Sequence, residues 1–262
     1  MSFRVPRLAG RQVDYWLTVL KRTFRGTLFT SFLMPFLYLT AMGVGLGTFV
    51  DSASASETLG GLTYLQFIAP GLLATTAMQT AVFESTYPVM SGFKWQRVYY
   101  SMAASPLEPV DIVFAQLGFI AFRVFIACGV FLGFMAAYGA LADWWGAVLA
   151  LLVSVLVGLA HGAPVAGLSA RMRTESGFSL IFRLGMMPMF LFSGAFFPIT
   201  QLGDFAWIAY LTPIWSGVNL ARMLTSDTID PWIALFNLVY LVAWTVFGWF
   251  YAVRGFEKRL AQ

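Results

Sequence analysis

Hydrophobic residues along the chain gather in six long segments that polar stretches separate. A helix rises about 1.5 Å per residue, so roughly 20 apolar residues are needed to cross the ~30 Å hydrocarbon core of a bilayer. All six segments reach that length, and they run over about 28–50, 64–89, 111–138, 144–168, 178–197 and 232–253. The pattern predicts an all-α polytopic membrane protein, with six transmembrane helices in the single domain 1–262.

The polar stretches differ in charge, and this difference orients the predicted helices. Basic residues crowd the segment before the first span, the loops after the second and fourth spans, and the tail. The 51–63 loop has two acids and no base, and the 198–231 loop has three acids and only Arg222. Because cytoplasmic loops carry an excess of Lys and Arg, both termini are predicted to be cytoplasmic in a multi-pass protein of the plasma membrane.

The first 26 residues have the period of an amphipathic helix. Apolar side chains such as Trp16 and Leu20 recur on one face, and bases such as Arg11 and Arg22 fall on the other. This pattern predicts a cytoplasmic helix over 1–26 that lies in the headgroup region. Two roles stay open for it, a simple orientation anchor and a helix that also contacts a cytoplasmic partner.

A second cytoplasmic element is predicted between the second and third spans. Four side chains share one helical stripe, and Pro106 and Pro109 then end the helix. The stripe consists of Trp95, Val98, Tyr99 and Met102. A short amphipathic helix over 92–105 has no core of its own, so it is expected to lie on the membrane or in a groove of another protein. A solvated loop is the alternative.

The segment 198–224 is apolar, yet Pro198, Asp204 after Gly203, and Pro213 cut it into pieces too short to span a bilayer. Non-helical backbone at membrane depth is tolerated only where protein or a water-lined cavity satisfies it. The sequence therefore predicts two re-entrant helices at the outer face, near 204–211 and 214–224. They would cap the pathway or act as its exit gate, and an amphipathic lid on the headgroups is the alternative. The gate candidates are Phe196, Phe197, Pro198, Asp204 and Pro213.

Few polar groups lie inside the predicted spans. Glu84 and Arg123 fall in the cytoplasmic halves of the second and third spans. An ionised side chain at a helix centre costs roughly 2.5–3.5 kcal/mol on insertion scales, so we expect the two to pair or to face a polar cavity. Glu84 snorkelling alone to the interface is the alternative. His161 and Cys128 are each the only residue of their type, and both are expected to have packing roles.

Composition excludes several classes of protein. Hydrophobic residues make up 59% of the chain and charged residues 11%, against roughly 45–50% and about 25% in soluble domains. The net charge of +4 comes from bases beside the spans rather than from a stripe on a soluble domain, so nucleic-acid binding is not expected. The three lysines follow Leu20, Phe93 and Glu257, which excludes the G-x-x-x-x-G-K-[ST] phosphate loop. No metal site and no catalytic cluster can be read from the sequence.

Three stretches resemble the type 2 membrane domain of ATP-binding-cassette (ABC) exporters, with a pattern similar to nodulation-factor and drug-export permeases. "YLQFIAPGLLATTAMQTAVFESTY" (64–87) is similar to the second span of that family. "WQRVYYSMAASPLEPVDIV" (95–113) resembles its cytoplasmic coupling element. "SGAFFPITQLGDFAWIAYLTPIWSGVNLAR" (193–222) resembles its outer signature and is the most specific of the three.

The resemblance implies the partners and the source of energy. Two such six-span subunits, either two copies or two related permeases, would form the pathway, and separate ABC ATPase subunits would dock below. The coupling helix over 92–105 would receive their motion through Lys94, Trp95, Arg97, Val98, Tyr99 and Met102. ATP and Mg would bind to the partner, so this chain is expected to hold no cofactor and to be no enzyme by itself.

The aromatic residues and the scarcity of charge inside the spans favour an amphipathic or hydrophobic substrate, while lipid-facing aromatics explain most of the aromatic content. The resemblance implies a lipid-linked saccharide, a glycolipid or a drug that moves outward. An ion-coupled carrier or channel, and a membrane-embedded enzyme acting on lipid, are the alternative functions. A carrier is expected to place several acids deep in its spans, whereas only Glu84 qualifies.

Overall fold

The computed structural model describes residues 33, 36–47 and 61–261, and every regular element within them is a helix. The predicted interface helix over 1–26, with Arg11, Trp16, Leu20 and Arg22, lies outside the described residues. So does most of the predicted first span, 28–50. The described part of that span includes the π-helical turn η1 (Leu39–Leu46), which packs against α4.

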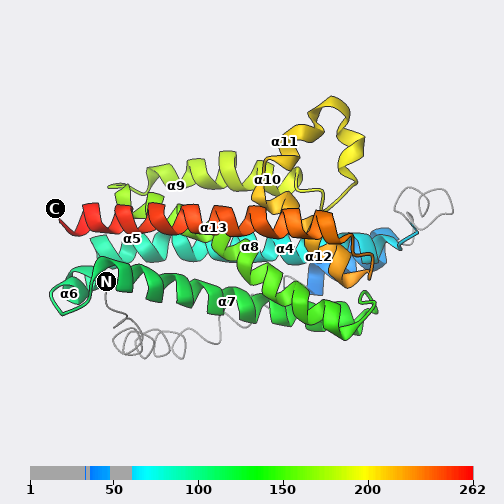
Figure 1. The fold of residues 1–262 in the computed structure, drawn as a ribbon, viewed down its shortest axis with the longest axis horizontal. Coiled ribbons are helices and arrows are strands. Elements are labelled where there is room, and N and C mark those ends of the chain that lie inside the picture. Colours follow the sequence, from blue (N-terminus) through cyan, green and yellow to red (C-terminus); the bar gives the residue numbers. More distant parts are fainter. Residues whose placement is uncertain (1–32, 34–35, 48–60, 262) are drawn as a thin grey trace.

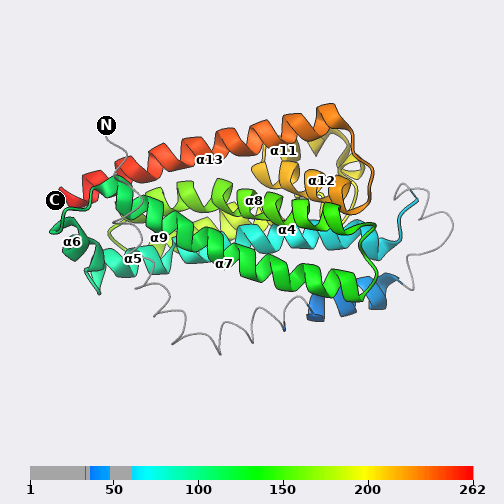
Figure 2. The same ribbon diagram turned by 60° about the horizontal axis from the view of Figure 1, so that its bottom comes forward.

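Four long helices run lengthwise through the molecule (Figures 1 and 2). They are α4 (Tyr64–Ser85), α7 (Pro109–Ala137), α8 (Trp144–Arg171) and α13 (Pro231–Leu260). Among the described residues, α7, α8 and α13 are long and apolar enough to cross a membrane. The chain is therefore an all-helical, multi-pass membrane protein.

Side chains just before the long helices fix where they begin. Thr63 and Gln66 form a reciprocal capping box at the start of α4. The carboxylate of Asp143 accepts a hydrogen bond from the Gly146 amide at 2.9 Å, and Asp230 accepts one from the Trp232 amide at 2.9 Å. These caps satisfy amide groups that a helix start leaves without intrahelical partners. Local polar contacts thus determine where α4, α8 and α13 begin.

Helix α8 lies at the centre of the bundle and contacts α4, α7, α12 and α13. Small residues bring the backbones close. A Cβ on Gly162 would lie 3.2 Å from the Cβ of Ala81 on α4. A Cβ on Gly255 would lie 2.7 Å from the carbonyl oxygen of Gly167, so α13 and α8 cross at these two glycines. Close packing of this kind takes the place of a hydrophobic driving force in membrane helix association.

Two predicted spans end earlier than the sequence indicated. The second, predicted over 64–89, breaks at Thr86, and a separate helix α5 (Tyr87–Lys94) follows with Pro88 in its first turn. The fifth, predicted over 178–197, ends at Leu191. It consists of α9 (Ser176–Leu180), the π-helical turn η2 (Ile181–Met186) and α10 (Met187–Leu191). Its pieces hold five, six and five residues, which is about 24 Å of helix and short of a full crossing.

The prediction of one helix over 92–105 is wrong. Helix α5 ends at Lys94, and the short α6 (Val98–Ala103) begins after a turn in which Arg97 has a φ of 54°. The reason is packing, because the ring of Tyr99 folds back onto Gly92, where any Cβ would collide with it. A continuous helix would carry Tyr99 away from this contact. Helix α6 lies at the end of the bundle that also holds the C-terminal end of α13 (Figure 1).

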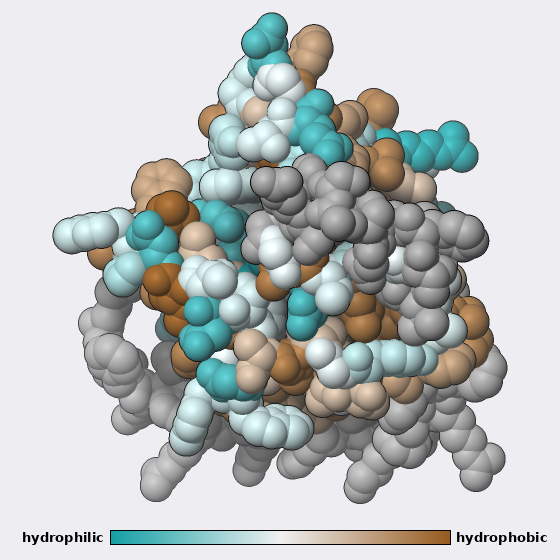
Figure 3. Space-filling view, turned by 90° about the vertical axis from the view of Figure 1, so that its right-hand side faces the viewer, coloured by the Kyte–Doolittle hydropathy of each residue, from teal (hydrophilic) through white to brown (hydrophobic). Residues whose placement is uncertain are grey.

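At the opposite end of the bundle, the segment 198–224 forms the short helices that its sequence predicts. The 3-10 helix η3 (Ile199–Phe205) and α11 (Ala206–Tyr210) project from the bundle, and α12 (Pro213–Thr225) packs against α4, α8 and α13 (Figure 1). Figure 3 views this end and shows hydrophilic and hydrophobic residues mixed across it. The two helices predicted near 204–211 and 214–224 thus correspond to α11 and α12, although α11 is shorter than predicted.

Candidate functional site

An apolar cavity of about 320 Å³ lies within the bundle, between α4, α8, η2, α10, α12 and α13. Its volume is at the lower end of the range typical of small-molecule sites, roughly 300–1,000 Å³. Methionines supply much of the wall, and their flexible thioethers adapt to irregular ligands. The residues that line it are Met78, Val82, Ala160, His161, Pro164, Val165, Ile181, Gly185, Met186, Met189, Leu211, Pro213 and Trp244.

His161 supplies the polar side chain of this wall. It is 6% exposed, and its Nδ1 lies 2.8 Å from the carbonyl oxygen of Val157. Because a carbonyl only accepts, Nδ1 carries the proton, and Nε2 of the neutral ring is an acceptor. Nε2 is buried and has no hydrogen-bond partner among the described residues. A hydroxyl or amide group in the cavity could therefore donate a hydrogen bond to it.

The turn between α11 and α12 forms one side of the cavity. Leu211 and Pro213, which flank the turn between α11 and α12, both contribute to the lining. Pro213 is buried at the first position of α12. A movement of this turn would therefore change the shape of the cavity directly.

Arg222 fastens α12 to the rest of the bundle. Its Nε donates to the carbonyl oxygen of Phe67 at 3.2 Å, and its Nη2 donates to that of Gly194 at 2.8 Å. The guanidinium also lies 3.9 Å from the centre of the Phe67 ring, within the range of a cation–π contact. Arg222 thus joins α12 to the first turn of α4 and to the irregular 192–198 segment, where it satisfies the carbonyl group of Gly194.

Arg222 is not among the site residues predicted from the sequence, although its charge could have indicated it. It is the only base in the 198–231 loop, where the charge pattern of an outer loop disfavours bases. The residues that were singled out do not form one cluster. Phe196 packs edge-on against Phe190 with ring centres 4.9 Å apart, and Phe197 and Pro198 are half-buried. Asp204 is exposed on the projecting η3.

Glu84 and Arg123 lie on α4 and α7, and the structure brings their side chains together. Nε of Arg123 donates to Oε1 of Glu84 at 2.9 Å, and Nη2 lies 2.8 Å from the same oxygen. Both side chains are 18% exposed. Because both contacts use Oε1, the pair does not form the parallel two-oxygen fork that makes the strongest arginine–carboxylate pairs.

Tyr99 is the most deeply placed of the predicted coupling residues. It is fully buried, and its hydroxyl donates to Oε1 of Gln116 on α7 at 2.9 Å. Its ring centre lies 4.7 Å from that of Phe93 and 5.2 Å from that of Phe256 on α13. These contacts make α5, α6 and the adjoining parts of α7 and α13 one packed unit, which we call the elbow.

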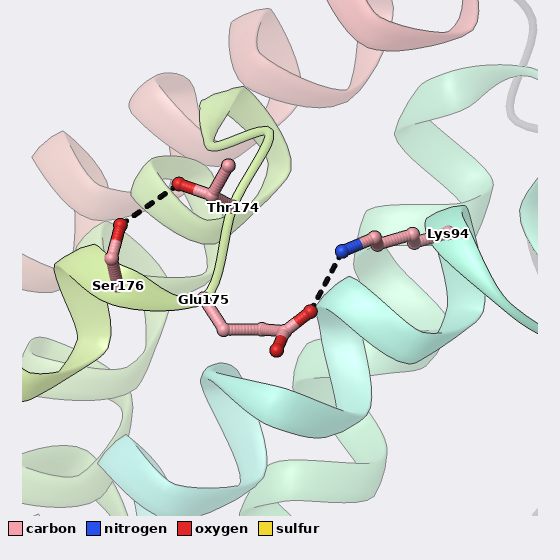
Figure 4. Close-up of polar contacts among 4 residues, drawn as sticks. All are labelled: Lys94, Thr174, Glu175 and Ser176. Carbon is pink, nitrogen blue, oxygen red and sulfur yellow. Dashed lines mark hydrogen bonds and ion pairs between the residues drawn. The ribbon is translucent and has the colours of Figure 1, made fainter.

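The other predicted coupling residues lie on or near the surface of the elbow. Lys94 forms an ion pair with Glu175 at 2.7 Å, which connects α5 to the loop before α9 (Figure 4). Thr174 and Ser176, the neighbours of Glu175, share a hydrogen bond of 2.9 Å between their hydroxyl groups (Figure 4). Trp95 is 54% exposed and Arg97 is exposed, whereas Val98 and Met102 are half-buried.

No group of three or more His, Cys, Asp or Glu residues suited to a metal ion occurs in the part of the chain that the structure describes. Cys128 is buried and reduced, and its Sγ lies 3.8 Å from the carbonyl oxygen of Leu73. The described residues thus offer an apolar cavity bordered by the turn between α11 and α12, together with a packed elbow. The cavity suits the binding of an apolar ligand.

Comparison with known proteins points the same way. The profile of the ABC-2 type transporter family matches residues 14–225. The chain is 29% identical to Nodulation protein J of Rhizobium leguminosarum bv. trifolii over 236 residues, which covers 86% of this chain and 87% of that protein. It is 27% identical to Nodulation protein J of Neorhizobium galegae over 256 residues, with 94% of each chain covered.

Proposed function

Because the chain belongs to the ABC-2 type transporter family, we propose that it is the membrane-spanning subunit of an exporter whose ATP is hydrolysed by a separate subunit. The family match over residues 14–225 is the observation that carries this proposal. It covers α5, α6, the re-entrant helices and every residue that lines the cavity except Trp244. The relatives named Nodulation protein J match along most of their length, which supports a whole permease rather than a shared fragment.

The topology we propose has six crossings and cytoplasmic termini. Helices α7, α8 and α13 cross the membrane fully, and α4 with α5 makes a fourth crossing. The helix formed by α9, η2 and α10 makes a shorter fifth one that the re-entrant segment completes at the outer face. The sixth is the predicted first span over about 28–50, most of which lies outside the described residues. The elbow then lies on the cytoplasmic side, at the end where bases are most frequent in the sequence.

The elbow is the proposed contact with the ATPase subunit. Trp95 and Arg97 are exposed on it and available to a partner, while Tyr99 anchors α6 to α7 and α13. Because the packed elbow is stiff, a push on α6 would move these two membrane helices with it. ATP and Mg would belong to the partner, consistent with a sequence that has no Gly-Lys phosphate loop.

The proposed substrate is amphipathic or hydrophobic, and a second permease subunit, either a copy of this chain or a related one, would complete its pathway. The apolar cavity supports this class, since its walls solvate an acyl chain or a ring system well. Nε2 of His161 would accept a hydrogen bond from a hydroxyl or amide of the substrate. Saccharide-bearing lipids and many drugs combine both features.

The re-entrant hairpin is the proposed exit gate. Leu211 and Pro213 wall the cavity, and Arg222 holds α12 in place through the carbonyl groups of Phe67 and Gly194. Two arrangements of these contacts, one closed and one open, would be populated in turn as ATP binds and is hydrolysed.

The direct test is the ATPase activity of the chain co-purified with its partner subunit in lipid nanodiscs. We expect hydrolysis to rise when an amphipathic substrate is added. Arg97→Glu should weaken ATPase binding at least tenfold, because it reverses an exposed charge on the elbow. Arg183→Gln, which removes an exposed charge of η2 without placing a carboxylate in a proposed crossing, is the control and should bind the ATPase normally. Unchanged binding and stimulation in Arg97→Glu would count against the elbow as the docking site.

A further inference from the structure

A cluster of bases lies where α8 and α13 end. Five basic side chains line one cavity of about 400 Å³, and no acidic residue of the described chain lines it. They are Arg171, Arg173, Arg254, Lys258 and Arg259. We call these residues the basic cavity. Neither of the two ion pairs found among the described residues involves them.

Close packing of two membrane helices gathers these charges. The backbones of α8 and α13 meet at Gly167 and Gly255, and Gly255 itself lines the cavity. Arg171 follows Gly167 by about one turn, and Arg254 and Lys258 lie within a turn of Gly255 on α13. The partial negative charges at the two helix ends, about half a unit each, offset only a small part of five positive charges. The cavity therefore has a net positive charge that favours the binding of an anion.

The depth of the cavity matches the membrane interface. The guanidinium of Arg171 lies 4.0 Å from the ring centre of Tyr251, a residue of the long apolar helix α13. Tyrosine rings are typical of the headgroup level, where one end of the side chain is apolar and the other is polar. The Tyr251 contact and the position at the ends of two long apolar helices are what is expected of a site at the headgroup level.

One face of α13 carries an apolar surface up to this cavity. Phe247, Phe250, Arg254 and Lys258 follow each other at spacings of three and four residues, so they lie on one side of the helix. Phe247 and Phe250 are 56% and 57% exposed, and Arg254 and Lys258 are exposed as well. Two exposed aromatic rings followed by two exposed bases match the order of acyl chain and phosphate in a phospholipid.

We propose that the basic cavity binds the phosphate headgroup of an anionic glycerolipid, whose acyl chains lie along Phe247 and Phe250. A basic pocket between membrane helices is a known form of lipid recognition. The bound lipid would bridge α8 and α13 at their glycine crossing and hold the two helices together. The site is distinct from the apolar cavity at His161, and it does not depend on which substrate the protein moves.

The test uses the full-length chain, purified in detergent and stripped of lipid. Phosphatidylglycerol and phosphatidylcholine are titrated separately, and bound lipid is counted by native mass spectrometry alongside the melting temperature. We expect phosphatidylglycerol to bind more tightly and to raise the melting temperature more. The double variant Arg254→Gln with Lys258→Gln should lose affinity for phosphatidylglycerol about 30-fold, at roughly fivefold for each charge.

Two further variants test whether the loss of lipid affinity comes from the charges of the basic cavity. Arg254→Lys retains the charge and should bind within about twofold of the wild type. Arg183→Gln removes an exposed arginine outside the cavity and should leave the affinity unchanged. The comparison of the two lipids on the wild-type chain needs no variant, so a variant that fails to fold does not leave the proposal without a test.

Three outcomes would overturn the proposal. The first is equal affinity for the two lipids, and the second is a double variant that binds phosphatidylglycerol like the wild type. The third is displacement of the lipid by millimolar inorganic phosphate, which would identify a site for free phosphate instead. A double variant that loses the ATPase subunit while it keeps its lipid affinity falls under the second outcome and would assign the cavity to protein docking.

Discussion

The ion pair between Glu84 and Arg123 allows a quantitative prediction. Glu84→Gln keeps the shape of the side chain but leaves the guanidinium of Arg123 without its carboxylate at two contacts, 2.9 and 2.8 Å long. An unpaired charge at a helix centre costs about 2.5–3.5 kcal/mol on insertion scales, and breaking a buried pair costs about 3–5 kcal/mol. Because both side chains keep 18% exposure, we expect a loss of about 2–3 kcal/mol.

The double variant Glu84→Gln with Arg123→Gln should be less damaging than the sum of the two single variants. Two neutral amides can still share a hydrogen bond, and no charge is left unpaired. We expect a coupling energy of about 1–3 kcal/mol in a double-mutant cycle. Melting in nanodiscs is the assay, and a loss of about 2 kcal/mol should lower the Tm by about 4–8 °C at this chain length.

The geometry of the Glu84–Arg123 pair suggests a further variant as a control for the double-mutant cycle. Both contacts of Arg123 end on Oε1 of Glu84, so the second carboxylate oxygen is not part of a fork. Arg123→Lys should therefore keep more than half of the coupling energy, whereas a two-oxygen fork would lose most of it. Strictly additive losses in the cycle would refute the reasoning, since they would mean that the two side chains do not stabilise each other.

Three other side chains give predictions of their own. Tyr99→Phe removes the buried hydrogen bond to Gln116 and should lower the free energy of unfolding by about 1–2 kcal/mol. It should also lower the amount of substrate moved per ATP hydrolysed. An unchanged ratio would mean that the elbow does not couple ATP hydrolysis to transport. Arg222→Lys cannot reach both carbonyl groups in the same way, so transport should fall while expression is retained, and loss of expression alone would make the residue purely structural. His161→Phe should raise the substrate concentration for half-maximal ATPase stimulation about fivefold, and an unchanged value would place the substrate elsewhere.

Several features of the fold could be predicted from the sequence because local chemistry determines them. The hydrophobic segments near 111–138 and 144–168 correspond to α7 and α8 within three residues at each end. The segment near 232–253 correctly predicts the start of α13, which continues seven residues further, to Leu260. Pro213 gave the start of α12 because proline suits the first turn of a helix. The charges of Glu84 and Arg123 are costly in lipid, so their partnership could be expected from position alone.

Other features depend on contacts between distant residues, which spacing does not report. The apolar run 178–197 continues past Leu191, but the backbone turns at Gly194, which has a φ of +76°. Tyr99 looked like a surface residue of an amphipathic stripe, yet it is fully buried against Phe93 and Phe256. Its burial depends on α13, which lies more than a hundred residues further along the chain.

The glycine pairs illustrate the same limit. Gly158 and Gly162 have the four-residue spacing of close helix packing, and both meet neighbouring helices at distances that a Cβ would crowd. Gly129 and Gly133 have the same spacing on α7, yet nothing lies within 4 Å of a Cβ built there. The sequence pattern cannot separate these two cases, because the difference lies in which face of the helix meets a neighbour.

We propose above all that this chain moves an amphipathic substrate with energy from a partner ATPase. The most direct measurement is transport into inverted proteoliposomes that contain the chain and the ATPase subunit, with a fluorescent lipid-like substrate. Uptake should require ATP, persist when ion gradients are collapsed, and disappear when the ATPase subunit is left out. Uptake that follows an ion gradient and proceeds without ATP or the ATPase subunit would contradict the account.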